Sequence, residues 1–457
     1  MSSITQELGA YVSALQYSQI PSSAADMAKK CVLDAAANII YGRYTETGER
    51  ALAYATAFER GGTGSCDTFR SGSWPLETAA FLHAVMSRCA DLDDGNRFAM
   101  GHPGCVLVPV TLAAAQEYRR SGEELLCALT AGYDVYVRLG RSINPTSYRD
   151  RGFDATGLCG AAAAAAVTAK LMGLDAAQTA DAIGLASLFC GGLIEYQNDG
   201  TMGKTLCGAW AASTGIRAAR LAQQGFTGPV KAIEGKKAFA QAFSNAPDTS
   251  RVLEKLNKEY AIESGYLKLH ACMRGLHSAI DAAVALKKAH SLEPQAIKAV
   301  TVHTTPFVQR LSNPAPTTPV GAQCSLEFSM ATAFCNGHLS DEHLLVKSLD
   351  DPTVLALAQR ISIVLDPELE RFVQAHPDNW SAVRVEVVTA SGETFSETVL
   401  LPCGEPENPL SWDDAEAKFD RMTENALSAE AGRALKEKIR SLHTESAAQI
   451  GTFWQLS

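Results

Sequence analysis

The sequence predicts a mainly α-helical protein with a large all-helical domain and a smaller α/β lid domain. Its 457 residues exceed the roughly 100 to 200 residues of one ordinary domain. Up to about residue 245, apolar residues recur at the three- and four-residue spacing of helices. From about residue 265, several stretches alternate apolar and polar residues with the period of two that is typical of strands.

The helical part begins at Ala24–Ala35, with Ser22 and Ser23 as candidate N-caps. The same periodicity predicts further helices at 49–60, 76–90, 106–118, 122–140, 155–172, 174–188 and 206–224. The alanine-rich run Ala161–Ala169 lets neighbouring helices approach closely, and alanine has the highest helix propensity. We therefore expect a central, buried helix there.

The second part contains strand patterns. Ile297–Thr304 alternates with period two, and Val383–Val388 leads through Ser391-Gly392 into Glu393–Val399. Because Ser-Gly is a turn signal, the last two stretches predict a β-hairpin.

The end of the chain returns to helix. The proline-rich segment Pro402–Pro409 is typical of a linker, and helices are predicted at 413–422 and 426–442. We expect these helices to pack on the first domain. The predicted division is therefore 1–262 with 410–457 for the helical domain and 263–409 for the lid.

Composition limits the classes of partner. The chain has 40 basic and 50 acidic residues, a net charge of −10, which argues against a nucleic acid or an anionic membrane as the main partner. No basic leader precedes an apolar segment, and no window approaches about 18 consecutive apolar residues. We expect a cytoplasmic protein.

The twelve cysteines are widely scattered, and no two lie at the two- to four-residue spacing of zinc ligands. They are expected to be reduced and mostly buried, as small apolar side chains.

An acidic segment follows the predicted helix 76–90. Asp91, Asp93 and Asp94 lie at its C-terminal end, where the helix dipole disfavours negative charge. His102 follows in a Gly-His-Pro-Gly loop, and a histidine beside carboxylates is typical of proton transfer. The alternative is a solvated acidic loop.

Cofactor motifs are missing from the sequence. The acidic segment does not match an EF-hand, because Gly95 is fifth from Asp91 and His102 occupies the twelfth position. Gly200–Thr205 has two residues between its glycines where a phosphate loop has four. No Gly-x-Gly-x-x-Gly or Gly-x-Ser-x-Gly is present. We expect no metal and no organic cofactor.

A cationic segment indicates an anion site. Within ten positions the chain has Lys268, His270, Arg274 and His277. Arginine can bind a carboxylate through two parallel hydrogen bonds, so a polycarboxylate would fit. The alternative is an ordinary helix start in which His277 pairs with Asp281. Lys204, which precedes a predicted helix, is either a surface lysine or a further anion contact.

At these residues the chain resembles the MmgE/PrpD family, which includes 2-methylcitrate dehydratase, cis-aconitate decarboxylase and iminodisuccinate epimerase. The resemblance covers nearly the whole chain. Its carriers are Asp91–Asp94 with His102–Gly104, Arg151–Gly157, Lys204, Gly225–Pro229 with Glu234-Gly235, and Lys268–His277. It implies a helical domain, a smaller α/β lid, a site between them, a homodimer, and catalysis without a cofactor.

The resemblance also implies roles for single residues. Asp91 and His102 become the proton-transferring pair, and Lys204 and Lys268 bind substrate carboxylates. Arg274 and His277 complete the anion pocket.

The chain departs from the family pattern at three positions. Asp154 stands where lyases of the family commonly have a histidine. Gly95 and Phe328 align with a threonine and a tyrosine of decarboxylase-type members. These departures argue against decarboxylation and the usual dehydration, and leave the shared removal of a proton next to a carboxylate intact.

The expected function is a cofactor-independent enzyme that abstracts a proton alpha to a carboxylate of a small di- or tricarboxylate. The outcome is either that of a dehydratase-like lyase or that of a closely related isomerase. An iminodisuccinate-type epimerase is an alternative, since the carboxylate of Asp154 suits a cationic nitrogen. A non-catalytic dimeric anion-binding scaffold is another, although retention of Asp91, His102, Lys204 and Lys268 favours an enzyme.

Overall fold

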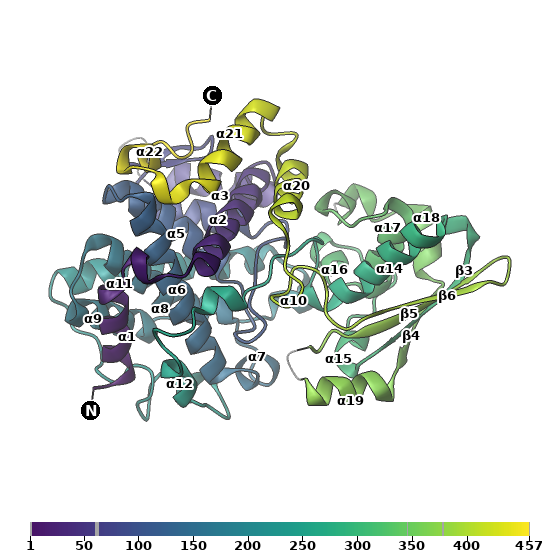
Figure 1. The fold of residues 1–457 in the computed structure, drawn as a ribbon, viewed down its shortest axis with the longest axis horizontal. Coiled ribbons are helices and arrows are strands. Elements are labelled where there is room, and N and C mark those ends of the chain that lie inside the picture. Colours follow the sequence, from purple (N-terminus) through teal and green to yellow (C-terminus); the bar gives the residue numbers. More distant parts are fainter. Residues whose placement is uncertain (1, 60–63, 345, 377–378, 457) are drawn as a thin grey trace.

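The computed structural model describes residues 2–59, 64–344, 346–376 and 379–456. Two bodies lie side by side in it, a large helical body and a smaller one with a sheet (Figure 1). The predicted fold class, mainly α with a smaller α/β domain, is confirmed. The chain passes between the bodies twice, near residues 265–273 and again near 400–410.

The main helices of the large body are α1 (Ile4–Ala14), α2 (Ser22–Gly42), α3 (Glu46–Phe58), α4 (Leu76–Ser87), α5 (Gly104–Glu117), α6 (Gly122–Ile143), α8 (Ala155–Met172), α9 (Ala176–Leu188) and α11 (Leu206–Gln223). Shorter elements are α7 (Thr146–Arg149), α10 (Tyr196–Asp199), η2 (Met202–Thr205), α12 (Phe239–Phe243) and α13 (Ser250–Leu253). The eight predicted helices of this part are all present. Residue 60, the expected end of the second one, lies outside the described residues.

This body differs from the sequence interpretation in three main features and in the short helices α7, α10, α12 and α13, which were not predicted. Helix α1 was missed, although the capping box of Ser3 and Gln6 marks its start. The short hairpin of β1 (Cys66–Thr68) and β2 (Gly72–Trp74) was missed as well. The N-cap prediction for α2 is wrong, because Pro21 precedes the helix and Ser22 is already its first residue.

Helix α8 is the centre of the large body. It packs against α5, α6, α9 and α11, and almost all its residues are buried. By length and composition it could cross a membrane, since its 18 residues have a mean hydropathy of 1.4. Because 89% of the window is buried inside the protein, α8 is accounted for as a core helix.

The smaller body contains a four-stranded sheet in the order β4-β3-β5-β6. Its strands are β3 (Ile297–Thr304), β4 (Ile361–Leu365), β5 (Val383–Thr389) and β6 (Thr394–Val399). Its main helices are α14 (His277–His290), α17 (Leu326–Asn336), α18 (Pro352–Ala358) and α19 (Pro367–Ala375), with short α15 (Pro306–Gln309), α16 (Pro319–Gln323) and η4 (Arg274–Leu276).

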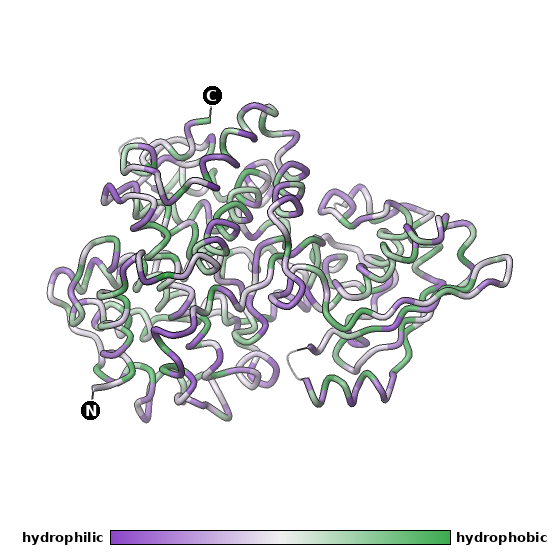
Figure 2. Tube along the Cα trace, in the orientation of Figure 1, coloured by the Kyte–Doolittle hydropathy of each residue, from purple (hydrophilic) through white to green (hydrophobic). Residues whose placement is uncertain are grey.

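The predicted strand and hairpin are present in the sheet. β5 pairs antiparallel with β3 and β6, and its alternate residues Val383, Val385 and Val387 are fully buried. Strand β4, which pairs parallel with β3, was missed. It is an edge strand with a single buried residue, so its sequence lacks the alternation of a half-buried strand. Along α19, Figure 2 shows hydrophilic and hydrophobic residues alternating, as in an amphipathic surface helix.

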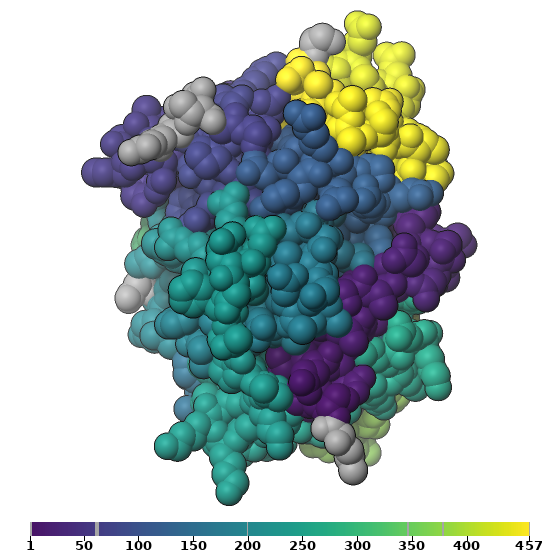
Figure 3. All heavy atoms as spheres, turned by 90° about the vertical axis from the view of Figure 1, so that its left-hand side faces the viewer, coloured from purple at the N-terminus to yellow at the C-terminus, as the bar shows by residue number. Residues whose placement is uncertain are grey.

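The last helices, α20 (Trp412–Thr423), α21 (Ala429–Arg440) and α22 (Ala447–Gly451), lie on the large body, where α20 packs against α2. Lys418 of α20 is buried, forms an ion pair with Asp34 and donates to the Leu92 carbonyl oxygen at 2.6 Å. In Figure 3 the N-terminal segment and the C-terminal helices are both visible on one side of the large body. The two ends of the chain therefore complete the same body.

Asp281 of α14 binds both of the segments that connect the two bodies. Asp281 Oδ1 lies 2.7 Å from His270 Nε2, and Asp281 Oδ2 accepts a hydrogen bond from the Cys403 amide at 2.7 Å. The alternative pairing of His277 with Asp281 is therefore wrong.

The contact between α8 and α11 gives a stability prediction. A Cβ added at Gly215 of α11 would lie 2.5 Å from the Ala164 Cβ and 2.7 Å from the Ala161 carbonyl oxygen. We expect Gly215→Ala to lower the free energy of unfolding by about 1–3 kcal/mol, because the helices must move apart. Urea denaturation followed by circular dichroism measures this.

The matched control is Gly432→Ala in α21, where the nearest atom to an added Cβ is 3.8 Å away. This variant should be as stable as the parent or up to about 1 kcal/mol more stable, because alanine favours the helix. Equal effects of the two substitutions would contradict the close α8–α11 contact.

Candidate active site

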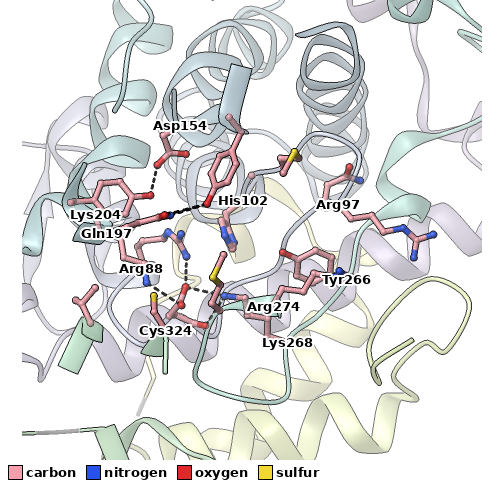
Figure 4. A pocket seen from close by; sticks show the side chains of 18 of the residues that line it. Arg88, Arg97, His102, Asp154, Gln197, Lys204, Tyr266, Lys268, Arg274 and Cys324 are labelled. Atoms are coloured by element: carbon pink, nitrogen blue, oxygen red, sulfur yellow. Dashed lines mark hydrogen bonds and ion pairs between the residues drawn. The ribbon is translucent and has the colours of Figure 1, made fainter. Parts of the chain in front are cut away.

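A cavity lies between the two bodies, with about 750 Å³ of empty space including its open mouth. Its polar lining residues are Arg88, Asp91, Asn96, Arg97, His102, Tyr148, Asp154, Tyr196, Gln197, Lys204, Tyr266, Lys268 and Arg274. Met273, Phe307, Val320, Cys324 and Trp380 contribute further wall from the lid side. Figure 4 shows how the polar side chains converge on this space.

The buried carboxylate of Asp91 is the centre of the site. Arg88 Nη1 and Lys268 Nζ lie 2.8 and 2.9 Å from its Oδ1, and Lys204 Nζ lies 3.0 Å from its Oδ2. Burial alone would raise the pKa of Asp91, but these cations hold it well below its ordinary value. Asp91 is therefore a permanent anion that orders three cations.

The backbone also contributes to this arrangement. Asp91 has φ of +53°, a left-handed conformation that L-residues rarely adopt, and its carbonyl oxygen accepts a hydrogen bond from Lys268 Nζ at 2.9 Å. Such conformations cluster at functional sites because the surrounding contacts must maintain them. The sequence interpretation missed Arg88, and the available signal was its three-residue spacing from Asp91 at a helix end.

The cation cluster has an excess of positive charge. Arg88 Nη1 also binds Asp93 Oδ1 at 2.7 Å, so three cations face the carboxylates of Asp91 and Asp93. One positive charge remains uncompensated in a chain whose net charge is −10. Lys204 additionally donates to Gln323 Oε1 at 2.9 Å. The surplus charge and the buried amines suit an anionic ligand.

His102 lines the cavity, and its hydrogen bond determines which ring nitrogen carries the proton. Its Nδ1 lies 2.7 Å from the Asp94 carbonyl oxygen, which can only accept, so Nδ1 carries the proton. Its Nε2 then carries the lone pair and has no hydrogen-bond partner within the described ranges. Burial, with the neighbouring Arg88, lowers the pKa of His102 to about 4. The imidazole is therefore a neutral base at neutral pH.

Asp94 supports the histidine loop. Its Oδ1 accepts a hydrogen bond from the Gly104 amide at 2.7 Å, and its Oδ2 accepts one from the Tyr133 hydroxyl at 2.6 Å. Burial raises the pKa of Asp94 to about 7. Because its carbonyl oxygen also holds His102, Asp94 fixes this loop on the start of α5.

Asp154 lies in the cavity wall as the N-cap of α8. Its Oδ1 accepts a hydrogen bond from the Thr156 amide at 2.8 Å, and its Oδ2 accepts one from the Tyr196 hydroxyl at 2.9 Å. An aspartate directly before the alanine-rich helix was a signal for this cap that the sequence interpretation did not use. Both carboxylate oxygens have structural partners.

The cationic segment is only partly in the site. Arg274 lines the cavity, forms an ion pair with buried Glu405, and stacks on Trp380 at 4.6 Å from its guanidinium carbon to the ring centroid. His277 does not reach the cavity: it is 2% exposed and its Nε2 lies 3.3 Å from the Cys272 carbonyl oxygen. Helix α14 begins at His277 and directs its side chain into the lid.

The other two departures from the family pattern are also resolved. Gly95 forms a backbone bridge to Tyr266 beside the cavity. Phe328 is fully buried in α17 and is not part of the cavity wall. Position 328, which aligns with a tyrosine of decarboxylase-type members, therefore lies outside the cavity wall.

The described residues contain no group of three or more His, Cys, Asp or Glu side chains with a metal-binding arrangement. Asp91 and Asp93 are bound by protein cations, and Asp94 by an amide and a hydroxyl. The twelve cysteines are free, and six of them are buried.

Comparisons with known proteins match both halves of the chain. The MmgE/PrpD N-terminal domain matches residues 6–252, and the MmgE/PrpD C-terminal domain matches residues 270–444. A cis-aconitate decarboxylase-like protein, oryM, of Aspergillus oryzae (strain ATCC 42149 / RIB 40) is 27% identical over 97% of this chain and 95% of its own length. A cis-aconitate decarboxylase of Aspergillus terreus (strain NIH 2624 / FGSC A1156) is 24% identical over 89% and 86%.

The electrostatics of His102 can be tested in the free protein. Its NMR signals should titrate near pH 4, well below the ordinary pKa of about 6.5, so that the ring is neutral above that pH. Arg88→Gln should raise this pKa, because a positive charge that disfavours the imidazolium is removed.

The control is Arg371→Gln, which removes an exposed arginine of α19 and should leave the titration unchanged. A wild-type midpoint near 6.5, or no rise in the Arg88 variant, would contradict the electrostatic role of this cluster.

Proposed function

The chain belongs to the MmgE/PrpD family, and we propose that it is a lyase that removes a proton next to a carboxylate of a small di- or tricarboxylate. The observation that carries this proposal is the neutral imidazole of His102, whose free Nε2 borders a cavity rich in buried cations. The proposed reaction uses neither a metal nor an organic cofactor.

In the first step His102 Nε2 takes the carbon-bound proton. The electron pair of the broken C–H bond moves onto the neighbouring carboxylate, where Lys204 and Lys268 offset the developing charge. The imidazolium that forms is stabilised by the Asp94 carbonyl oxygen and by Asp93 Oδ2, 2.7 and 3.3 Å from Nδ1.

The second step returns the proton. If the substrate has a hydroxyl on the next carbon, the imidazolium protonates it and it leaves as water, with a carbon–carbon double bond formed. Asp91 takes no part as a base in this scheme, because its pKa is held well below the ordinary value by three cations. We assign it to the positioning of those cations.

Two outcomes in place of dehydration remain alternatives. Decarboxylation is favoured by the names of the two relatives, and in it a proton must be delivered after carbon dioxide leaves. His102, neutral in the free protein, would need a bound polyanion to raise its pKa before it could serve as that donor. Epimerisation was suggested by Asp154, whose oxygens are already engaged by Thr156 and Tyr196.

A homodimer is part of the proposal. The ring of Phe81 in α4 contacts Tyr54 of α3 on one side and Trp210 of α11 on the other. The side chains of Tyr54 and Trp210 are 43% and 56% exposed. Phe189 is 75% exposed and shares a shallow hollow with Trp210. An apolar surface of this kind is typical of a protein interface, and a second copy of the chain is the occupant we propose.

The first test replaces His102. We expect His102→Ala to reduce turnover by about a hundredfold or more, the usual effect of losing a general base, with an unchanged melting temperature. Citrate, methylcitrate and aconitate are the substrates to try, with NMR in heavy water detecting deuterium next to a carboxylate. His376→Ala, an exposed histidine at the end of α19, is the control and should keep full turnover. Near-normal turnover of His102→Ala would remove the base from the proposal.

A second test identifies the reaction and the cofactor requirement. With exhaustive chelation, we expect deuterium incorporation and water elimination to continue at the unchelated rate, because the cations of the site are side chains. Release of carbon dioxide without exchange in the remaining substrate would favour decarboxylation. Activity that is lost on chelation and restored by a divalent ion would contradict cofactor independence.

A further inference from the structure

We propose that the Tyr266 hydroxyl is a catalytic hydrogen-bond donor to the substrate carboxylate on which negative charge develops. This inference rests on the proposed function. It adds a neutral hydrogen-bond donor to the three cations of the site, Arg88, Lys204 and Lys268. Tyr266 lies in the segment that carries the chain from the large body into the lid, two residues before Lys268.

The backbone fixes Tyr266 beside the acidic segment. The Gly95 amide donates to the Tyr266 carbonyl oxygen at 3.0 Å, and the Tyr266 amide donates to the Gly95 carbonyl oxygen at 2.8 Å. His102 is bound to the residue before Gly95, since its Nδ1 donates a hydrogen bond to the Asp94 carbonyl oxygen. The imidazole and the phenol ring are thus held by adjacent residues of one turn.

The ring can occupy this place only because residue 95 is glycine. A Cβ at Gly95 would lie 2.2 Å from the Tyr266 hydroxyl oxygen and 2.3 Å from its Cζ. Any side chain at position 95 would therefore push the phenol out of its position. Glycine allows the phenol to lie directly against this turn, in which the Asp94 carbonyl oxygen accepts the hydrogen bond of His102.

The hydroxyl is available to a ligand. Tyr266 is 6% exposed and lines the cavity, and its hydroxyl has no hydrogen-bond partner among the residues that the structure describes. In Figure 4 the hydroxyl end of the ring points into the space beside His102. Arg274 lies 5.6 Å from the ring centroid, so a cation supports the ring.

The chemistry follows from the burial of the phenol. Burial raises the pKa of Tyr266 above its ordinary value of about 10, so the group keeps its proton throughout the cycle. It donates a hydrogen bond and transfers no proton, which leaves the proton balance of His102 unchanged. A preorganised donor of this kind is worth about a hundredfold or more in turnover, because its bond strengthens as charge develops.

The test is Tyr266→Phe, which deletes one oxygen and keeps the ring over Gly95. We expect kcat to fall by about a hundredfold, with KM within threefold and an unchanged melting temperature. Tyr260→Phe is the matched control: it removes a hydroxyl bound to the Gln19 carbonyl oxygen, away from the cavity, and should keep kcat.

A binding measurement gives a second readout. The nitronate of 3-nitropropionate resembles a carboxylate that has received the electron pair, whereas succinate resembles the resting acid. Tyr266→Phe should weaken nitronate binding at least tenfold and succinate binding less than threefold. If the wild type is active and Tyr266→Phe keeps kcat and nitronate affinity within threefold of it, the proposed role of the hydroxyl is overturned and the proposed function is not. A wild type that exchanges no deuterium into any of the tested acids overturns the proposed function and this inference together.

Discussion

The buried carboxylate of Asp91 is the constraint on which the site depends. An ion removed from water costs several kcal/mol unless it is paired with good geometry, and Asp91 meets this requirement with three cations within 3.0 Å. The cations come from three separate places: Arg88 from the end of α4, Lys204 from η2, and Lys268 from the segment that enters the lid. Asp91 therefore joins two parts of the helical body to the passage into the lid, and each cation is ordered before any substrate arrives.

The same charges determine the protonation of His102. A positive cluster beside a buried imidazole disfavours a further cation, so the ring stays neutral although Asp93 is only 3.3 Å away. A site that only bound anions would gain from a protonated histidine. Keeping the ring neutral reduces the attraction for an anion and preserves a base, and this balance favours catalysis over passive binding. The left-handed backbone at Asp91, which allows Lys268 to bind both its carbonyl and its carboxylate, is maintained by the same contacts.

Local sequence patterns predicted most of the long helices of the large body and three of the four strands of the main sheet, because burial of one face leaves a regular period. They could not show that Lys268 reaches Asp91, 177 positions earlier in the chain, and only the family resemblance placed both in one site. The sequence patterns also could not predict the directions of the side chains. Arg274 and His277 are three residues apart, yet Arg274 lines the cavity and His277 is enclosed in the lid. Tyr266 was overlooked since its position depends on the absence of a side chain at Gly95.

A second ionic cluster couples the cavity to the lid. Glu405, on the segment that returns from the lid, accepts a hydrogen bond from Arg97 Nη1 of the large body at 2.9 Å and forms an ion pair with Arg274 of the lid. All three residues are buried. Deleting Glu405 would leave the buried guanidinium of Arg274 without its ion-pair partner, which is strongly destabilising. Separating the bodies is different, because it admits water to the same ions and their hydration offsets part of the lost pairing. Separating an ionic seam of this kind therefore costs less than separating an apolar seam of equal area, which would expose surface that water does not stabilise. Arg274 lines the cavity, and its Nη2 has no partner among the described residues, so the guanidinium keeps a hydrogen-bond donor that its ion pair with Glu405 does not use.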